Sequence, residues 1–199
     1  MATYTTTRRL SREQRRDTLL AAAAAILAER GTGGLTMERL AEVAEVSKAL
    51  PYRHFDNAEQ VLAELSWREI VLLGEHVAVV RSQIDDPGER LRATVETFFD
   101  VVSERPGLSQ IFAAIGGPQG APPPSAGGDS RTFLGRILVE DVALDPDRAE
   151  AAATVFRASL LGATAAWLEG GATKPDSVRI VVAIAGSLAQ SLRPDADRG

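Results

Sequence analysis

The sequence predicts an all-α protein of about nine helices, in which three N-terminal helices form one domain and the remaining helices form a larger second domain. Three observations support this fold class. Apolar residues recur at i, i+3, i+4 and i+7 through most of the 199 residues, which is the period of a helix buried on one face. Helix-starting and helix-ending residues separate these stretches. Strand-like alternation of apolar and polar residues is missing.

Capping residues bound the first three helices. Ser11 is the expected cap of a helix that reaches about Arg30 and ends at Gly31. Thr36 is the expected cap of the second helix, and the apolar stripe that follows it is Met37, Leu40, Ala41 and Ala44. A turn at 44–46 and a cap at Ser47 then introduce the third helix, so residues 35–54 form two helices joined by a tight turn.

Similar signals start the later helices. Asp56 and Glu59 have the spacing of a capping box, and Asp86-Pro87 and Asp145-Pro146 each place a proline directly after an acidic cap. The expected helices are residues 56–80, 86–105, 108–115, 130–142, 145–169 and 175–192, with a proline- and glycine-rich loop at 116–130. We expect the domains to span residues 12–72 and 73–195.

Residues 35–54 have the layout of a helix-turn-helix, which lays its second helix in the major groove of DNA. The segment 47–55 reads Ser-Lys-Ala-Leu-Pro-Tyr-Arg-His-Phe. We assign Ala49 and Leu50 to the groove-facing surface, where apolar atoms meet thymine methyl groups, while Lys48 and Arg53 offer charge to phosphates. The spacing alone fits an ordinary helix pair in a helical core equally well.

Charge is distributed unevenly along the chain. The net charge is −5, yet residues 1–54 hold nine Lys and Arg against six Asp and Glu, so a basic N-terminal part precedes an acidic remainder. A basic end on an acidic protein points to a polyanionic partner. Arg8, Arg9 and Arg12 precede or begin the first helix, and they form either an arm that reaches a phosphate or the minor groove, or a solvated tail.

Residues 15–65 contain six pieces in a specific order and spacing: Arg16-Asp17-Thr18-Leu19-Leu20-Ala21-Ala22-Ala23, Glu29-Arg30-Gly31, Leu35-Thr36-Met37-Glu38-Arg39-Leu40-Ala41, Val46-Ser47-Lys48, Tyr52-Arg53-His54-Phe55 and Glu59-Gln60-Val61-Leu62. In this order the pieces resemble the TetR family of transcriptional regulators. In the family, side chains at Tyr52 and His54 contact phosphates. With the residues named above, the candidate interface to double-stranded operator DNA is Arg8, Arg9, Arg12, Thr36, Lys48, Ala49, Leu50, Tyr52, Arg53 and His54.

Two positions depart from the family pattern. Glu45 stands where the family usually has Gly, so we expect a turn conformation that a residue with a side chain can adopt. Ala58 stands where the family usually has a Lys, which removes one expected phosphate contact.

The last two predicted helices are more apolar than one core requires. In the final helix Ile180, Ile184 and Gly186 lie between the residues of the main apolar face, so the helix must be buried on two sides. A second subunit accounts for this, with a central helix of a monomeric bundle as the alternative. The resemblance also implies a two-fold interface of four helices. We expect a homodimer whose interface includes Val181, Ile184 and Leu188.

The middle of the chain, residues 91–167, holds most of the large aromatic side chains. For each of them core packing is the simpler interpretation. The resemblance implies a small-molecule effector site here, and the composition favours an apolar or planar aromatic effector. The candidate lining is Phe98, Phe99, Ser109, Phe112, Phe133, Phe156, Thr164 and Trp167.

Sequence patterns argue against an enzyme, a metal site and a cofactor. His54 and His76 lack acidic partners at the spacing of a zinc motif, and the Glu140-Asp141 pair has the position of helix-end charges. The chain has no cysteine, which fits the cytoplasm, and it shows no signal peptide or membrane-length apolar run. Three functions remain: an effector-released dimeric repressor on a palindromic operator, a DNA-binding regulator governed by a protein partner, or a helical protein–protein module that has lost DNA binding.

Overall fold

The computed structural model describes residues 11–105, 111 and 130–192. Within these residues the structure is all-helical, as the sequence predicts, with eight α-helices and no β-strand. The helices are α1 (Arg12–Arg30), α2 (Met37–Val43), α3 (Ala49–Tyr52), α4 (Ala58–Arg81), α5 (Pro87–Glu104), α7 (Ser130–Val142), α8 (Ala149–Leu168) and α9 (Lys174–Ser191), with two short 3-10 helices at Thr32–Gly34 and Pro146–Arg148. Most of the predicted helix at 108–115 and loop at 116–130 lies outside the described residues.

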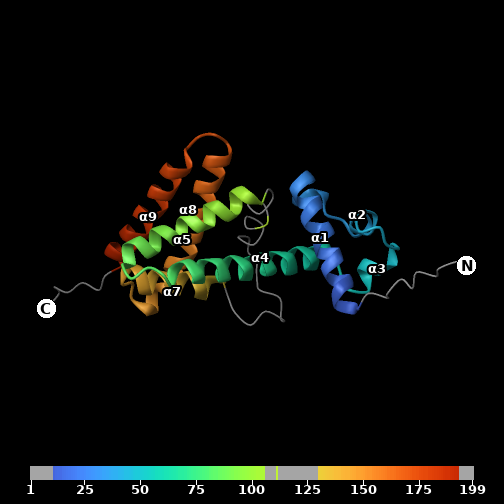
Figure 1. Ribbon diagram of the computed structural model, residues 1–199, viewed down its shortest axis with the longest axis horizontal. Coiled ribbons are helices and arrows are strands. Elements are labelled where there is room, and N and C mark those ends of the chain that lie inside the picture. Colours follow the sequence, from blue (N-terminus) through green and yellow to red (C-terminus); the bar gives the residue numbers. More distant parts are fainter. Residues whose placement is uncertain (1–10, 106–110, 112–129, 193–199) are drawn as a thin grey trace, which may run out of the picture.

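Helix α4 connects two helical parts (Figure 1). Its N-terminal end packs on α1, which with α2 and α3 forms the part we call the head. Its C-terminal end packs on α5, which with α7, α8 and α9 forms the part we call the body. The expected domain boundary after residue 72 falls inside α4, so one continuous helix passes from the head to the body.

Most of the predicted helix starts are confirmed. Ser11 forms a capping box with Gln14, while Thr36 and Asp86 each accept a hydrogen bond from a backbone N–H of the following first turn. Asn57, and not Asp56, caps α4, because its side chain accepts from the Gln60 N–H at 2.8 Å. Ser47 does not cap α3, which begins at Ala49 without a side-chain cap.

A buried ion-pair network fastens the end of α4 to the body. The Asp141 side chain on α7 has 0% of its surface exposed, and its carboxylate pairs with Arg81 at the end of α4 and with Arg90 on α5. Arg81 is 10% exposed, and it also pairs with Glu140 at 2.7 Å and reaches the Thr94 hydroxyl at 3.2 Å. The prediction of two helix-end charges is therefore wrong for Asp141, whose charge joins three helices.

One stretch, Pro146–Leu168, is long and apolar enough to cross a membrane by length and composition alone, which the sequence analysis did not anticipate. Only 28% of its most apolar window is buried within the chain. The same residues pack on α7 and α9 through Ala152, Phe156 and Leu160. Helix α8 thus has one face in the body and another face that is apolar and uncovered in the single chain.

Candidate nucleic-acid interface

The helix-turn-helix consists of α2, the turn and α3. Met37, Leu40 and Ala41 hold α2 in the head core. Beyond α3, Phe55 is 1% exposed, and the Pro51 carbonyl accepts hydrogen bonds from the N–H groups of residues 54 and 55, both at 2.9 Å. The inner side of α3 is thereby fixed, which leaves its other side free to meet a partner.

The free side of α3 carries most of the predicted contact residues. Lys48, Ala49, Tyr52 and Arg53 are exposed, whereas Leu50 is half-buried and presents less surface to a groove than the sequence suggested. Thr36 is exposed, but its hydroxyl oxygen already accepts from the Arg39 N–H at 3.1 Å. Arg8 and Arg9 lie outside the described residues.

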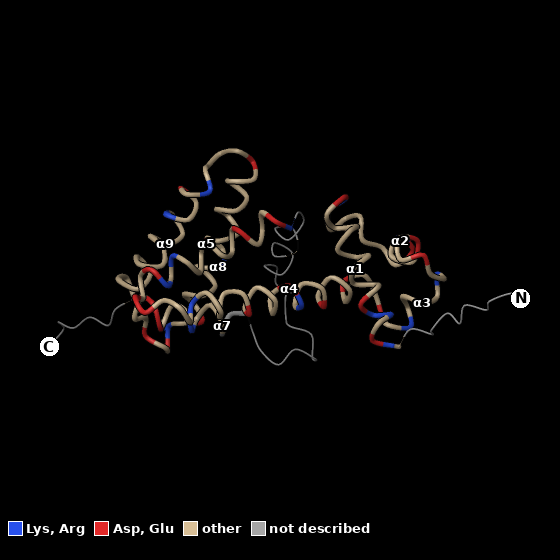
Figure 2. Tube along the Cα trace, in the orientation of Figure 1, with Lys and Arg blue, Asp and Glu red and all other residues tan. Residues whose placement is uncertain are grey.

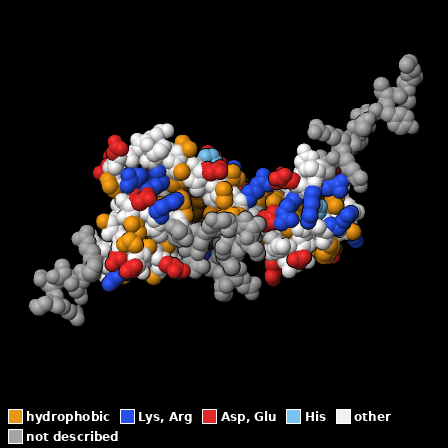
Figure 3. Space-filling model, turned by 90° about the horizontal axis from the view of Figure 1, so that it is seen from below, with side chains coloured by type: hydrophobic (Ala, Val, Ile, Leu, Met, Phe, Trp, Pro, Cys, Tyr) orange, Lys and Arg blue, Asp and Glu red, His pale blue; other side chains and the backbone are white. Residues whose placement is uncertain are grey.

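Arginines from two helices converge on His54, at the end of the recognition segment. Arg12, Arg15 and Arg16 of α1 and Arg53 beside α3 all exert a Coulomb effect on its imidazole. Lys48 and Arg53, like Arg12 and Arg15, make no ion pair within the part of the chain that the structure describes. Figure 2 marks the Lys and Arg positions along the Cα trace of the head, and Figure 3 shows basic side chains gathered on one face of it. Unpaired cations beside an exposed helix are the arrangement that phosphate binding requires.

Tyr52 is 53% exposed, and its hydroxyl donates to the Glu38 carboxylate of α2 at 3.1 Å. This hydrogen bond raises the pKa of Tyr52. The hydroxyl has to leave Glu38 before it can donate to a phosphate.

The turn between α2 and α3 contains a backbone conformation that side chains disfavour. Glu45 has φ = 53°, in the left-handed region, which a residue with a side chain can adopt but only at a cost. The Val46 N–H bonds to the Ala41 carbonyl at 3.0 Å, which holds the turn in this form despite the strain. A left-handed non-glycine residue costs about 1–2 kcal/mol.

Glu45→Gly is therefore expected to stabilise the protein by about 0.5–1 kcal/mol, since part of the relieved strain is offset by the greater freedom of glycine in the unfolded chain. Urea denaturation measures the change. Ala143→Gly is the matched control, because Ala143 also has a left-handed φ, 54°, but lies in the body after α7. Only Glu45→Gly also removes a negative charge beside the recognition helix and should strengthen DNA binding. If Ala143→Gly raised the free energy of unfolding and Glu45→Gly did not, the result would contradict the proposal that the backbone is strained at Glu45.

His54 gives stability a pH dependence. Burial, followed by the charges of Arg12, Arg16, Arg15 and Arg53, lowers its pKa below the ordinary value of 6.5. The unfolded chain therefore binds a proton more readily than the folded one, so this contribution to stability is complete above pH 6.5 and is lost as the pH falls below it. As the pH is lowered from above to below 6.5, the free energy of unfolding should fall less for His54→Gln than for the unsubstituted protein. His76→Gln, at an exposed position of α4, controls for the loss of a histidine as such.

The predicted effector residues are largely packed in the body. Phe99, Phe156 and Thr164 are buried, and the Thr164 hydroxyl donates to the Leu160 carbonyl at 2.8 Å. The Phe99 ring packs edge-on against Phe98 and Trp167, with centroids 5.6 and 5.7 Å apart. Phe133 and Trp167 are half-buried, while Ser109 and Phe112 lie outside the described residues. The ring contacts between Phe98, Phe99 and Trp167, and the burial of Phe156, agree with the interpretation of these side chains as part of the core.

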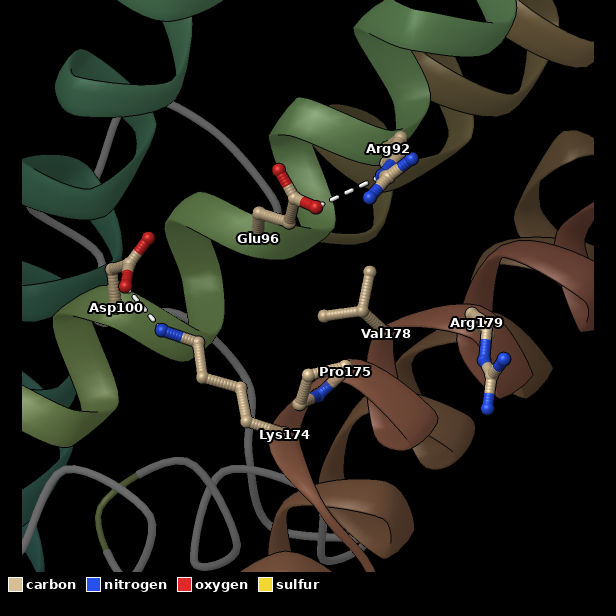
Figure 4. A pocket seen from close by; sticks show the side chains of 7 residues that line it. All are labelled: Arg92, Glu96, Asp100, Lys174, Pro175, Val178 and Arg179. Atoms are coloured by element: carbon tan, nitrogen blue, oxygen red, sulfur yellow. Dashed lines mark hydrogen bonds and ion pairs between the residues drawn. The ribbon is translucent and has the colours of Figure 1, made fainter.

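A hollow of about 390 Å³ between α5 and α9 is lined by different residues (Figure 4). Its charged side chains are paired within the protein: Arg92 with Glu96, Lys174 with Asp100, and Arg179 with Asp176. No sequence pattern marks this hollow, and its paired surface charges differ from the apolar lining expected of the effector site. Among the described residues, no group of three or more His, Cys, Asp or Glu side chains has the arrangement of a metal site.

Comparison with known proteins agrees with this geometry. A sequence profile described as "Bacterial regulatory proteins, tetR family" matches residues 19–65, which include α2, the turn and α3. The helix-turn-helix part of the chain, residues 19–65, therefore belongs to the TetR family. It is 34% identical over 105 residues to the HTH-type transcriptional activator FasR of Mycolicibacterium smegmatis, a match that covers 52% of this chain and 48% of that protein. The chain thus spans about half the length of the curated relatives it matches.

Solved structures extend the similarity to the whole fold. A putative tetR family transcription regulator from Shewanella sp. PV-4 has a TM-score of 0.71 at 14% identity and covers 87% of this chain and 97% of its own. The transcriptional regulator FadR from Bacillus subtilis, in complex with stearoyl-CoA, has a TM-score of 0.62 at 16% identity and covers 89% of this chain and 99% of its own. At these identities the two structures establish the TetR-family fold and nothing finer.

Proposed function

We propose that this TetR-family chain is a dimeric transcriptional regulator that binds a near-palindromic operator as a repressor and is released by a small-molecule effector. The observation that carries the proposal is a group of cations that make no ion pair among the described residues: Arg12 and Arg15 of α1, and Lys48 and Arg53 at the two ends of the exposed α3. A protein–protein module that had lost DNA binding would have no need of this concentrated positive charge on an otherwise acidic chain.

Repression requires only that the protein occupy its site, whereas activation requires a further surface that contacts the transcription machinery. The relative from Mycolicibacterium smegmatis is named an activator. A promoter reporter measured with and without the protein therefore tests whether this chain represses or activates transcription. Activation in that assay would reverse the proposed sign and leave DNA binding in place. Such a regulator acts in the cytoplasm.

The proposed dimer surface is the uncovered apolar face of α8 and α9. Val155 on α8 and Ile180 on α9 are 50% and 51% exposed, and Ala158 and Gly162 continue the uncharged face of α8. Small residues let two helices approach closely, so this face suits a four-helix contact about a two-fold axis. Of the predicted interface residues, Ile184 and Leu188 are half-buried, whereas Val181 is completely buried inside its own subunit. Val181 is therefore withdrawn from the interface, and Ile180 takes its place.

A two-fold dimer presents two copies of α3 to DNA. Helix-turn-helix dimers read half-sites about 34–36 Å apart, one turn of the duplex, so the operator should be a near-palindrome. A nuclease footprint on DNA upstream of the chain's own gene tests this. Protection of a single asymmetric half-site would contradict the proposed symmetry.

The effector is proposed to bind in the body and to act through α4. FadR of Bacillus subtilis is in complex with stearoyl-CoA, which agrees with an apolar effector for a protein of this fold. A ligand that prefers the non-DNA state a hundredfold shifts the equilibrium by about 2.7 kcal/mol. Operator affinity titrated with the small molecules that co-purify with the protein tests the claim. Binding that leaves operator affinity unchanged would favour a regulator governed by a protein partner.

Lys48→Ala is expected to weaken binding to all duplexes and to flatten the dependence of log affinity on log salt by about one unit, because a phosphate contact releases about one counterion. Gel shifts at several KCl concentrations measure the slope. Lys174→Ala is the matched control, since Lys174 lies in the body and is paired with Asp100. An unchanged slope for Lys48→Ala would show that Lys48 touches no phosphate.

A further inference from the structure

Arg16 differs from its neighbours in the arginine cluster of α1. Among the described residues Arg12 and Arg15 make no ion pair, whereas each of the three nitrogens of the Arg16 guanidinium donates a hydrogen bond within the protein. Its Nε and one terminal nitrogen pair with the two carboxylate oxygens of Glu64 on α4. The other terminal nitrogen donates to the His54 carbonyl at 2.7 Å. The position of Arg16 in the sequence, close to Arg12 and Arg15, gives no sign of this difference.

The same guanidinium also stacks on the core of the head. Its central carbon lies 4.4 Å from the centroid of the Phe55 ring, and Phe55 is buried. The planar guanidinium makes a bidentate ion pair, a third hydrogen bond and a ring contact. A lysine ammonium is a single point charge and cannot make all of these contacts. Three segments distant in sequence, at Arg16, at residues 54–55 and at Glu64, therefore meet at one side chain.

These contacts link the recognition helix to the connecting helix. Residues 54 and 55 directly follow α3, so the carbonyl and ring that Arg16 holds fix where α3 ends. Glu64 lies within the first two turns of α4, the helix that continues into the body. Any displacement of α4 is thus transmitted to α3 through a charged, geometrically specific contact as well as through apolar packing.

We propose that Arg16 is a positioning residue, which holds α3 at a fixed orientation on α4 through Glu64 and makes no contact with a phosphate. The proposal rests on the DNA-binding function proposed above. It predicts that Arg16 affects sequence-specific binding, which needs accurate placement of α3, and leaves the electrostatic binding of any duplex unchanged.

The experiment compares two probes, a duplex selected by the unsubstituted protein from a random-sequence pool and an unrelated duplex of equal length. Arg16→Lys keeps the charge and removes the fork, so the ratio of the two affinities should fall roughly tenfold or more, as for the loss of a hydrogen bond to a charged group. The salt slope and the affinity for the unrelated duplex should stay unchanged. Arg68→Lys, in an exposed ion pair between α4 and Asp17 of α1, should preserve the ratio. A preserved ratio for Arg16→Lys would overturn the proposal.

Glu64→Gln leaves every cation in place, and the two possible roles of Arg16 predict opposite effects of this substitution on DNA binding. If Arg16 positions α3, this substitution lowers the affinity ratio in the same direction as Arg16→Lys. If Arg16 instead serves phosphates, freeing it from Glu64 strengthens binding to both duplexes and steepens the salt slope, which would overturn the proposal. Circular dichroism melting verifies that each variant is folded. If Arg16→Lys does not fold, the result for Glu64→Gln decides between the two roles. Failure of the unsubstituted protein to select any duplex would instead refute the DNA-binding function itself.

Discussion

Asp141→Ala is expected to lower the free energy of unfolding by about 3 kcal/mol or more. The side chain is completely buried and pairs with both Arg81 and Arg90, so its removal leaves two largely buried cations without their main partner. Breaking a buried pair on one side is far more damaging than losing a surface pair, because the remaining charge has already lost its water. For a chain of this size the loss corresponds to a fall of roughly 6–12 °C in the melting temperature.

The matched control for Asp141 is its neighbour. Glu140→Ala removes a carboxylate that also pairs with Arg81, but the Glu140 side chain is 47% exposed, so the expected loss is below about 1 kcal/mol. Thermal and urea unfolding of the two variants give the comparison. Equal and small losses would show that the network is solvated and does not fasten α4 to the body.

Ile180→Glu is expected to convert the protein from a dimer to a monomer. Ile180 is half exposed in the single chain and lies on the uncharged face of α9, so the proposed contact would bury a carboxylate without a partner. Light scattering should give about the chain mass of 21.2 kDa for the variant and about twice that mass for the unsubstituted protein. Operator affinity should fall with it, since each monomer reads only one half-site.

Val79→Glu is the matched control for Ile180→Glu. Val79 is a more exposed apolar residue, but it lies on α4 and outside the proposed interface, so this variant should remain dimeric. Ile180 is a better test than Leu188, because Leu188 packs partly against its own core and a charge there would also disturb the fold. A dimeric Ile180→Glu, or a monomeric unsubstituted protein, would refute the interface.

Local features of the sequence were sufficient to predict the helices and the kind of site. A cap such as Ser11 or Asp86 acts within one turn of its own helix, so the residues themselves determine where that helix begins. The apolar stripe of α2 and the order of the TetR-family pieces are local in the same sense. For this reason the helix-turn-helix and the exposed positions Lys48, Tyr52 and Arg53 were predictable without coordinates.

Only the tertiary structure decided which charged and apolar side chains face inward. Arg16 and Arg15 are adjacent arginines, and Glu140 and Asp141 adjacent acids, so sequence assigns each pair one role. Adjacent residues on a helix point about 100° apart, and a partner more than 40 residues away determines which of the two is held inside the protein by an ion pair between helices. Val181 and Ile180 differ for the same reason. The sequence by itself thus determined the helices and the DNA-binding motif, whereas long-range packing decided how α3, α4 and the body are held together.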